Sequence, residues 1–468
     1  MLLKRLLLLS FILFSSISDS NKKVAFYINQ LDRIKNTGVL TVLTRYDQST
    51  YYESANGFSG LEYDLVMLFA KHLGVQVKFK LPETFQEILS QTEKGGFADF
   101  SAAGITITQE RNEHLFFTPA YQKITEQVVY RSGTKRPKKP EDLTKGILEI
   151  VQGTSHNESL LLLKEESPQL TWLINSELET DGLLYLLSER LIDYTIADSH
   201  QISLLRRFYP KLFVAFDISP PRRLAWAFAK TTDLSLYNEV TDFFQQISKN
   251  KTLDQLLERH YGHTYHASYV DNCIFKRDAS SRLPHYQDFF KAVAKKYQLD
   301  WRLLAAISYQ ESHWNKRAVS PTGVRGLMML TQSTAKGLGI KDRTDPLQSI
   351  EGGAKYFKQR IKKFPIRIPE PDRTWFALAS YNVGFGHVND ARILAQRLGK
   401  NPDKWVDVKQ TLPLLSEKKW YSQTKHGYAR GKEPVTYVTN IRSYYDLLIW
   451  KTTNKKLSEE SAMPLMQK

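Results

Sequence analysis

The chain has two regions that differ in their pattern of hydrophobic and polar positions. Between residues 38 and 131, short apolar runs alternate with segments of helical periodicity. The run Val39–Leu43 is β-branched and apolar, which predicts a buried strand, and 65–73 repeats apolar residues at helical spacing before Gly74. A second alternating run follows at 75–79. Strand–helix–strand units of this length predict a parallel sheet covered by helices.

The same pattern resumes after a polar break at 133–140. It begins with the apolar run 147–151 and a helix opened by Gly153-Thr154-Ser155, and it continues to about residue 262. The break itself, GTKRPKKP, is basic and typical of a solvated loop. We interpret the two halves as two lobes that this connector separates, with a cleft between them.

From about residue 284 the chain is helical, without alternating strands. Apolar stripes predict helices at 289–297, 301–308, 349–363, 373–381 and 434–450. The sequence therefore predicts two domains of different class. An α/β two-lobed domain spans 21–268, and a mainly α-helical domain spans 269–468.

The first residues predict an export signal at 1–18. Lys4 and Arg5 precede the apolar stretch 6–14, and the small residues that follow allow cleavage after Ser18. The stretch is short for a membrane span, although an uncleaved anchor stays open. Cys273 is the only cysteine. The chain therefore has no lipoprotein cysteine at the cleavage point, no intramolecular disulfide and no cysteine-based metal site.

The balance of charge narrows the class of partner. The 468 residues have ordinary globular composition, with 42% hydrophobic residues, but a net charge of +16. A basic surface favours anionic partners such as nucleic acid, acidic lipid headgroups or bacterial wall polymers. No zinc-finger spacing, helix-turn-helix signature or RNP motif is present, which disfavours nucleic acid. Peripheral association with a membrane or wall is the better fit.

One carboxylate stands alone in the helical half. Glu311 ends the apolar helix AAISYQE, ahead of SHWN and SPTGVRGLMML, and we expect it to lie partly buried against Tyr309 and Trp314. Desolvation raises the pKa of a carboxyl group, which suits it to act as a general acid. Glycosidases ordinarily use two carboxylates, yet no Asp or Glu stands between Glu311 and Asp342. The pattern favours a reaction in which the substrate supplies the second group.

Four segments of the helical half resemble a known superfamily. ISYQESHWN, SPTGVRGLMML, ASYNVGFGHV and YVTNIRSYY look like successive motifs of the lytic transglycosylases of the soluble-transglycosylase, goose-lysozyme-like superfamily, over about 285–450. Their pairing with the N-terminal module narrows the resemblance to the membrane-bound lytic murein transglycosylase F family. The resemblance implies a lysozyme-like fold and peptidoglycan glycan strands as substrate.

The resemblance also implies a mechanism. Glu311 would protonate the oxygen between N-acetylmuramic acid and N-acetylglucosamine, the 2-acetamido group would stabilise the oxocarbenium ion, and Glu311 would then accept the proton of the C6 hydroxyl. The product is a 1,6-anhydromuramyl end. The resemblance assigns substrate contacts to Ser320, Tyr381, Asn382 and Tyr437, and it assigns tight turns to Gly323 and Gly326. Met329 stands where the superfamily often has Gln and lacks that polar contact. No motif calls for a metal or an organic cofactor.

The N-terminal half resembles family 3 of the periplasmic solute-binding proteins, which bind polar amino acids. The similarity covers about 35–262, through GVLTVLTRYDQSTYY, GFSGLEYDLVMLFAKHLG, AAGITITQERNEHLFFTPAY and VQGTSHNESL. It implies that Arg111 and Thr106 bind a ligand carboxylate, that Thr154 adds amide donors and that Asp198 faces an ammonium group. We expect this module to sense an amino acid or a wall-peptide fragment and to gate the catalytic domain.

Several alternatives stay open. The enzyme could be a lysozyme-type hydrolase, or the chain a non-catalytic receptor for amino acids or glycan. Arg111 could form a surface ion pair with Glu110 or Glu113, and Tyr381 and Tyr437 could be core residues. The expected location is the periplasm, peripheral at the outer membrane of a Gram-negative bacterium.

Overall fold

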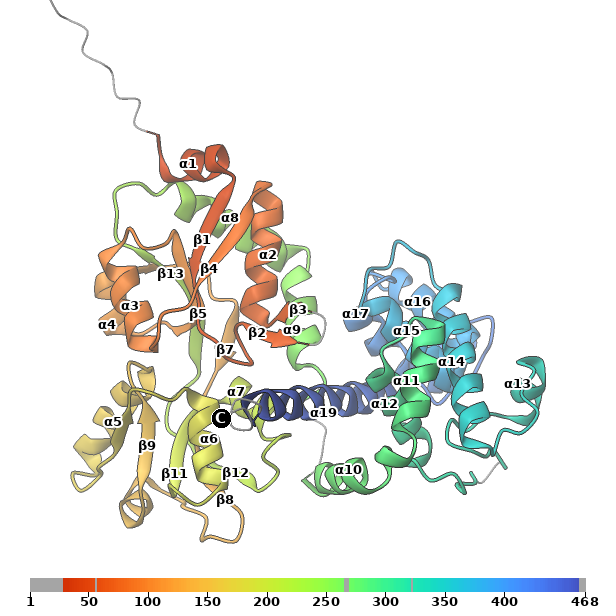
Figure 1. Ribbon diagram of the computed structural model, residues 1–468. Helices are drawn as coiled ribbons and strands as arrows, with labels where there is room; N and C mark the ends of the chain where they lie inside the picture. The colour runs from red at the N-terminus through yellow and green to blue at the C-terminus, as the bar shows by residue number, and fades with distance from the viewer. Residues whose placement is uncertain (1–27, 55–56, 265–268, 321–322, 463–468) are drawn as a thin grey trace, which may run out of the picture.

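The computed structural model describes residues 28–54, 57–264, 269–320 and 323–462. The predicted export signal and its cleavage point lie outside the described residues. Figure 1 shows a two-lobed α/β part beside a helical part, with the long helix α19 (Lys432–Ala462) extending between them. Both predicted fold classes are confirmed.

The first lobe is built on the predicted strands. β1 (Val39–Leu43) pairs in parallel with β4 (Gln76–Lys80) and with β5 (Phe100–Thr106), which is buried at every position. The sheet has the order β4-β1-β5-β13-β6, and β7 also pairs with β13. The other elements of this lobe are α1 (Gln30–Thr37), β2 (Tyr52–Ser54), β3 (Gly57–Ser59), α2 (Leu61–Leu73), α3 (Phe85–Lys94), α4 (Gln109–His114), β6 (Leu115–Phe117), β7 (Gln122–Ile124), β13 (Arg222–Ala229), α8 (Ser235–Lys249) and α9 (Thr252–Tyr261).

The second lobe is a smaller sheet with the order β10-β9-β11-β8-β12. Its central strand β11 (Tyr194–Asp198) pairs in parallel with β9 (Leu148–Val151) and antiparallel with β8 (Glu126–Arg131). The remaining elements are α5 (Ser155–Glu166), β10 (Leu173–Asn175), α6 (Thr180–Ser188), α7 (Ser199–Leu205) and β12 (Leu212–Asp217).

The prediction that residues 133–140 connect the two lobes is wrong. It follows β8 and precedes β9, so it is a loop inside the second lobe. The chain crosses between the lobes at Thr125, between β7 and β8, and returns before β13, which joins the first sheet antiparallel to β5. Because β13 is distant in sequence from the strands that it pairs with, local periodicity does not reveal this return.

The helical part matches four of the five predicted stripes within four residues, whereas the helix predicted at 434–450 is α19, which continues to Ala462. In α11 (Gln287–Tyr297) the positions Phe290, Val293 and Ala294 are buried, while Phe289 lies outside the stripe at 39% exposure. The other helices are α10 (Tyr269–Ser281), α12 (Trp301–Ser312), α13 (Gln332–Gly337), α14 (Pro346–Lys363), α15 (Asp372–Val383), α16 (Phe385–Arg397), α17 (Trp405–Thr411) and α18 (Lys418–Tyr421). In the part of the chain that the structure describes, no helix combines the length and apolarity that a membrane span requires.

Candidate active site and ligand site

Glu311 lies in the last turn of α12. Asp300 caps the start of this helix through a hydrogen bond from the amide of Arg302, and the left-handed conformation of His313 ends it. The Glu311 side chain is half-buried. Its Oε1 accepts a hydrogen bond of 2.5 Å from the hydroxyl of Tyr437, on α19.

The environment of Glu311 favours the protonated acid. Burial raises the pKa of Glu311 to about 7, and the Tyr437 hydroxyl opposes this rise because it stabilises the carboxylate. Among the described residues no charged side chain contributes to this shift. A group with a pKa near 7 is equally able to give and to take a proton at neutral pH.

Two tyrosines lie together beside this acid. The rings of Tyr381 and Tyr437 are nearly parallel, with centroids 6.4 Å apart, and the Tyr381 hydroxyl donates to the backbone oxygen of Met328 at 3.0 Å. Burial raises the pKa of both phenols well above 10, and the charge of Glu311 raises it further. Both hydroxyls therefore stay protonated as hydrogen-bond donors at neutral pH.

The predicted aromatic neighbours of Glu311 pack in another direction. Tyr309 and Trp314 join a buried cluster with Phe275 and Tyr444, and the Tyr309 hydroxyl donates to Asp278 at 3.2 Å. Residues two positions apart on a helix face different directions, so Tyr309 and Glu311 do not share a surface. The prediction of a buried acid was sound, but the prediction of which aromatic residues accompany it was wrong.

The loop after α12 holds four of the predicted positions, Ser320, Gly323, Gly326 and Met329. Ser320 shares two hydrogen bonds with Val324: its Oγ accepts from the Val324 amide at 3.0 Å, and its own amide donates to the Val324 oxygen at 2.9 Å. Gly326 has a φ of 87°, and a Cβ there would lie 2.0 Å from the backbone oxygen of Arg343. Met329 is half-buried with a φ of 45°.

The predicted active-site residues thus fall into two groups. Glu311, Tyr437 and Tyr381 are linked by contacts of their own, and the Met328 carbonyl ties the loop to them. Asn382 is exposed beside Tyr381, near the end of α15. Substrate contact stays a prediction for all five residues to which it was assigned, Ser320, Met329, Tyr381, Asn382 and Tyr437.

Arg111 bridges the two lobes. Its Nη1 donates to the Thr106 oxygen at 2.9 Å, and its Nη2 donates to the Gly153 oxygen, on the second lobe, at 2.8 Å. Its ion-pair partner is Glu158 at 3.8 Å, rather than Glu110 or Glu113 as the alternative had it. A cavity of about 330 Å³ is lined by Arg111, Gly153, Thr154 and Glu158, among others.

Thr154 and Asp198 both precede helices of the second lobe. Thr154 stands at the start of α5, where its Oγ1 donates to the Val151 oxygen at 2.8 Å. Asp198 caps α7 and contacts Nε2 of His156 at 3.0 Å. Burial raises the pKa of Asp198, but the hydrogen bond with His156 and the charge of Arg45 help to bring it below its usual range. Asp198 is therefore an anion inside the molecule.

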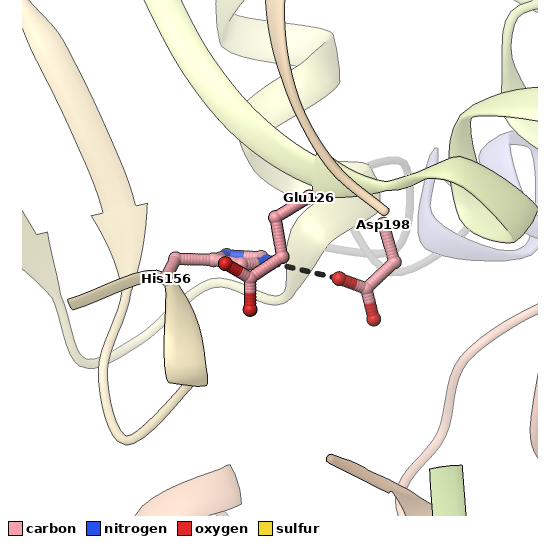
Figure 2. A group of neighbouring side chains, drawn as sticks. All are labelled: Glu126, His156 and Asp198. Atoms are coloured by element: carbon pink, nitrogen blue, oxygen red, sulfur yellow. Dashed lines mark hydrogen bonds and ion pairs between the residues drawn. The ribbon is translucent and has the colours of Figure 1, made fainter. Parts of the chain in front are cut away.

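Asp198 belongs to a buried group that Figure 2 shows with Glu126 and His156. One ligand atom of each lies within 4.8 Å of the others, a spacing that can hold a metal ion. The Glu126 oxygens already accept hydrogen bonds from two hydroxyls of α5, and Arg222 lies 3.9 Å away. A divalent cation would have to displace these donors and face the guanidinium, so the group is better described as a hydrogen-bonded polar network than as a metal site.

Sequence reasoning missed Arg45 in this region. It follows β1, is 5% exposed, pairs with Glu179 of the second lobe at 3.3 Å and lies 4.7 Å over the Phe85 ring. Its Nε is buried without a hydrogen-bond partner, as is Oδ2 of Asp47. The available signal was its place after a buried parallel strand, where ligands of α/β folds bind.

The two parts of the chain match two different families of known proteins. Residues 39–263 match the family model of bacterial extracellular solute-binding proteins, family 3, and residues 288–404 match that of the transglycosylase SLT domain. A solved cysteine-binding protein from Campylobacter jejuni matches with 19% identity over 52% of this chain and 98% of its own, at a TM-score of 0.46.

Relatives match this chain across both its α/β part and its helical part. Membrane-bound lytic murein transglycosylase F 1 of Alkalilimnicola ehrlichii is 47% identical over 90% of this chain and 85% of its own length. Membrane-bound lytic murein transglycosylase F of Saccharophagus degradans is 46% identical over 92% of this chain and 86% of its own. The chain therefore belongs to the membrane-bound lytic murein transglycosylase F family.

Proposed function

We propose that this chain is a peptidoglycan lytic transglycosylase in which Glu311 serves as both acid and base. Its relatives at 46–47% identity are named lytic murein transglycosylases. The observation that carries the proposal is the state of Glu311, a half-buried carboxyl with a pKa of about 7 and a single tyrosine donor. Among the described residues no second carboxylate contributes to the pKa of Glu311, which favours a substrate that completes the reaction itself.

The proposed reaction uses the bond between N-acetylmuramic acid and N-acetylglucosamine. Protonated Glu311 gives its proton to the glycosidic oxygen as the C1–O bond breaks, and the 2-acetamido oxygen stabilises C1. The Tyr437 hydroxyl holds the resulting carboxylate, which then takes the C6 hydroxyl proton as O6 bonds to C1. Glu311 ends protonated, and the 1,6-anhydromuramyl product forms without water.

The product separates this proposal from a lysozyme-type hydrolase. Digestion of purified sacculi should release fragments with anhydro ends, one water lighter than hydrolytic products, and Glu311→Gln should release none while keeping its fold. Gln310→Ala, at the neighbouring position, is the control and should keep activity. Reducing ends without anhydro ends would favour hydrolysis, and full activity of Glu311→Gln would remove the proposed acid.

For the N-terminal domain we propose a ligand with a carboxylate and an ammonium group, such as an amino acid or a wall-peptide fragment. Arg111 now uses a second-lobe carbonyl as acceptor, which a ligand carboxylate would replace with a stronger charge-assisted bond. Asp198 would receive the ammonium. Ligand binding between the lobes would gate the catalytic domain.

Calorimetry with stem peptides and free amino acids tests this part. Arg111→Ala should abolish the heat of binding. Arg33→Ala is the control and should retain the heat of binding. It removes an ion pair with Asp99, which directly precedes β5, at the end of the strand opposite to Thr106. Absence of binding by the unaltered protein would end the proposal.

We further propose a periplasmic enzyme held at the outer membrane or wall by its C-terminal domain. Residues 269–468 hold 35 of the 65 Lys and Arg residues but only 18 of the 49 Asp and Glu residues. The N-terminal part is thus nearly neutral, and the basic charge lies with the active site. Binding to sacculi or anionic vesicles should weaken as salt rises.

A further inference from the structure

Helix α19 belongs to both domains. It packs on α12 and α15 of the helical part, and it carries Tyr437, the hydrogen-bond donor to Glu311. Figure 1 shows the same helix continuing from the helical part toward the second lobe. Asp446 stands ~13 Å further along the helix axis than Tyr437. The helix that supports the acid is therefore also a connection to the N-terminal domain.

The N-terminal domain binds this helix through buried polar contacts. Asp446 accepts from Nη1 of Arg207 at 2.8 Å and contacts Nε2 of His263 at 2.5 Å. Arg442 donates to the Glu258 carboxylate at 3.0 Å and to the Glu258 carbonyl oxygen at 2.8 Å. Arg207, His263, Glu258 and Arg442 are each less than 10% exposed. We call this set of five residues the α19 clamp.

Electrostatic interactions restrict the geometry of the α19 clamp. Burial alone would raise the pKa of Asp446, but His263 and Arg207 bring it well below its usual range. The Arg442–Glu258 pair lies away from water and keeps one geometry, because a shift that breaks it leaves a buried charge without a partner. Arg442 lies in addition 3.9 Å over the ring of Trp375 on α15. The clamp therefore holds α19 in one register against both domains.

We propose that the N-terminal domain positions Tyr437 against Glu311 by clamping α19 at Asp446 and Arg442. The inference rests on the proposed role of Glu311. Asp446 is a positioning residue, since it acts through the helix and through Tyr437. The clamp also adjoins the ligand site, because Asp198 caps the start of α7 and Arg207 follows its end. Next to it, the ring of Phe208 stacks on that of Trp450, with centroids 4.9 Å apart.

The test is Asp446→Asn in the full chain, assayed on sacculi across pH. The Glu311–Tyr437 hydrogen bond should loosen, so kcat should fall several-fold with KM little changed. The alkaline limb of the rate profile should move up by roughly half to one pH unit, the equivalent of one hydrogen bond. Tyr437→Phe should move it in the same direction, since its hydroxyl stabilises the carboxylate. Tyr381, the other phenol facing Glu311, stays in place in both variants.

A double variant shows whether Asp446 acts through Tyr437. Asp446→Asn combined with Tyr437→Phe should move the limb no further than Tyr437→Phe alone. Tyr445→Phe is the matched control, because it removes an α19 hydrogen bond to Asp300 of the helical domain itself and should leave the limb unchanged. Ser443→Ala, which loses only a bond to the His263 oxygen, should give a smaller shift and serves if Asp446→Asn does not fold.

Two outcomes would overturn the inference. One is an unchanged pH profile in Asp446→Asn and Ser443→Ala; the other is a shift in the double variant equal to the sum of the single ones. Failure of the proposed function looks different. There, Glu311→Gln would remain active, and Tyr437→Phe would leave the profile unmoved.

Discussion

At the scale of single residues, Glu311 and Asp446 show how different environments give two carboxyl groups different roles. Burial dominates at Glu311, where only a hydroxyl opposes it and the pKa rises to about 7. At Asp446 the Arg207 guanidinium and the hydrogen bond with His263 outweigh burial, and the pKa falls. The first carboxyl can exchange a proton at neutral pH, and the second is a permanent anion that holds structure.

The raised pKa of Glu311 predicts a stability cost that depends on pH. Between its ordinary pKa of 4.5 and about 7, the folded chain holds a proton that the unfolded chain has released. The cost is absent below pH 4.5, where both states are protonated, grows as pH rises, and is complete above pH 7. Glu311→Gln should therefore be more stable than the unaltered protein by about 1–3 kcal/mol at pH 8 and by nearly nothing at pH 4.5.

Thermal unfolding of both proteins at the two pH values measures this difference. Glu83→Gln, an exposed acid of the first lobe, is a control that should show no such pH dependence. A gain of stability at pH 4.5 as large as that at pH 8 would contradict a buried, uncompensated carboxylate.

At the scale of elements, the loop from 323 to 331 connects the acid to the tyrosines, and its shape depends on glycine. Gly323 and Gly326 both have positive φ, 77° and 87°. An added Cβ meets nothing within 4 Å at Gly323, whereas at Gly326 it collides with backbone. Only Gly326 is therefore required for space as well as for conformation.

The two glycines predict a graded loss of stability. Gly323→Ala should cost about 1 kcal/mol from the left-handed conformation alone. Gly326→Ala should cost about 3 kcal/mol or more, because the segment that carries Met328 must move away from Arg343. Denaturant unfolding of the two variants measures the difference. Equal losses would show that conformation, and not the close backbone approach, is the constraint.

At the scale of the whole molecule, Glu258 of α9 ties the domains together. It pairs with Arg442 of α19 and with Lys409 of α17, and it is 9% exposed. A buried pair contributes little net stability compared with apolar packing, but the loss of one partner is expensive because the other charge stays buried. The interface thus makes the unfolding of one domain depend on the other.

Glu258→Gln should destabilise the chain by about 3–5 kcal/mol, because Arg442 and Lys409 lose their counter-charge. Calorimetry should show one cooperative transition for the unaltered protein and two separate transitions for the variant. Glu433→Gln, which removes an exposed pair with Arg430 near the start of the same helix, is the control and should change stability by less than ~0.5 kcal/mol. Two transitions already in the unaltered protein would contradict this coupling.

Much of this molecule is determined locally and is readable from the order of residues. The strand at 39–43 and the helix that ends before Gly74 follow from periodicity and a single left-handed residue. The isolation of Glu311 follows from the absence of acids nearby in the sequence, and its family motifs surround it. These features depend on neighbours within a few positions, which is the range that such patterns cover.

The partners across space were decided only by the tertiary structure. The hydroxyl that binds Glu311 comes from a residue 126 positions later, and the return of β13 to the first sheet joins strands that are equally remote. The bridge from Arg111 to Gly153 and the clamp on α19 likewise depend on how lobes and domains pack. Such contacts reflect the summed burial of many side chains, whereas the sequence pattern of any one segment records only which of its faces is apolar.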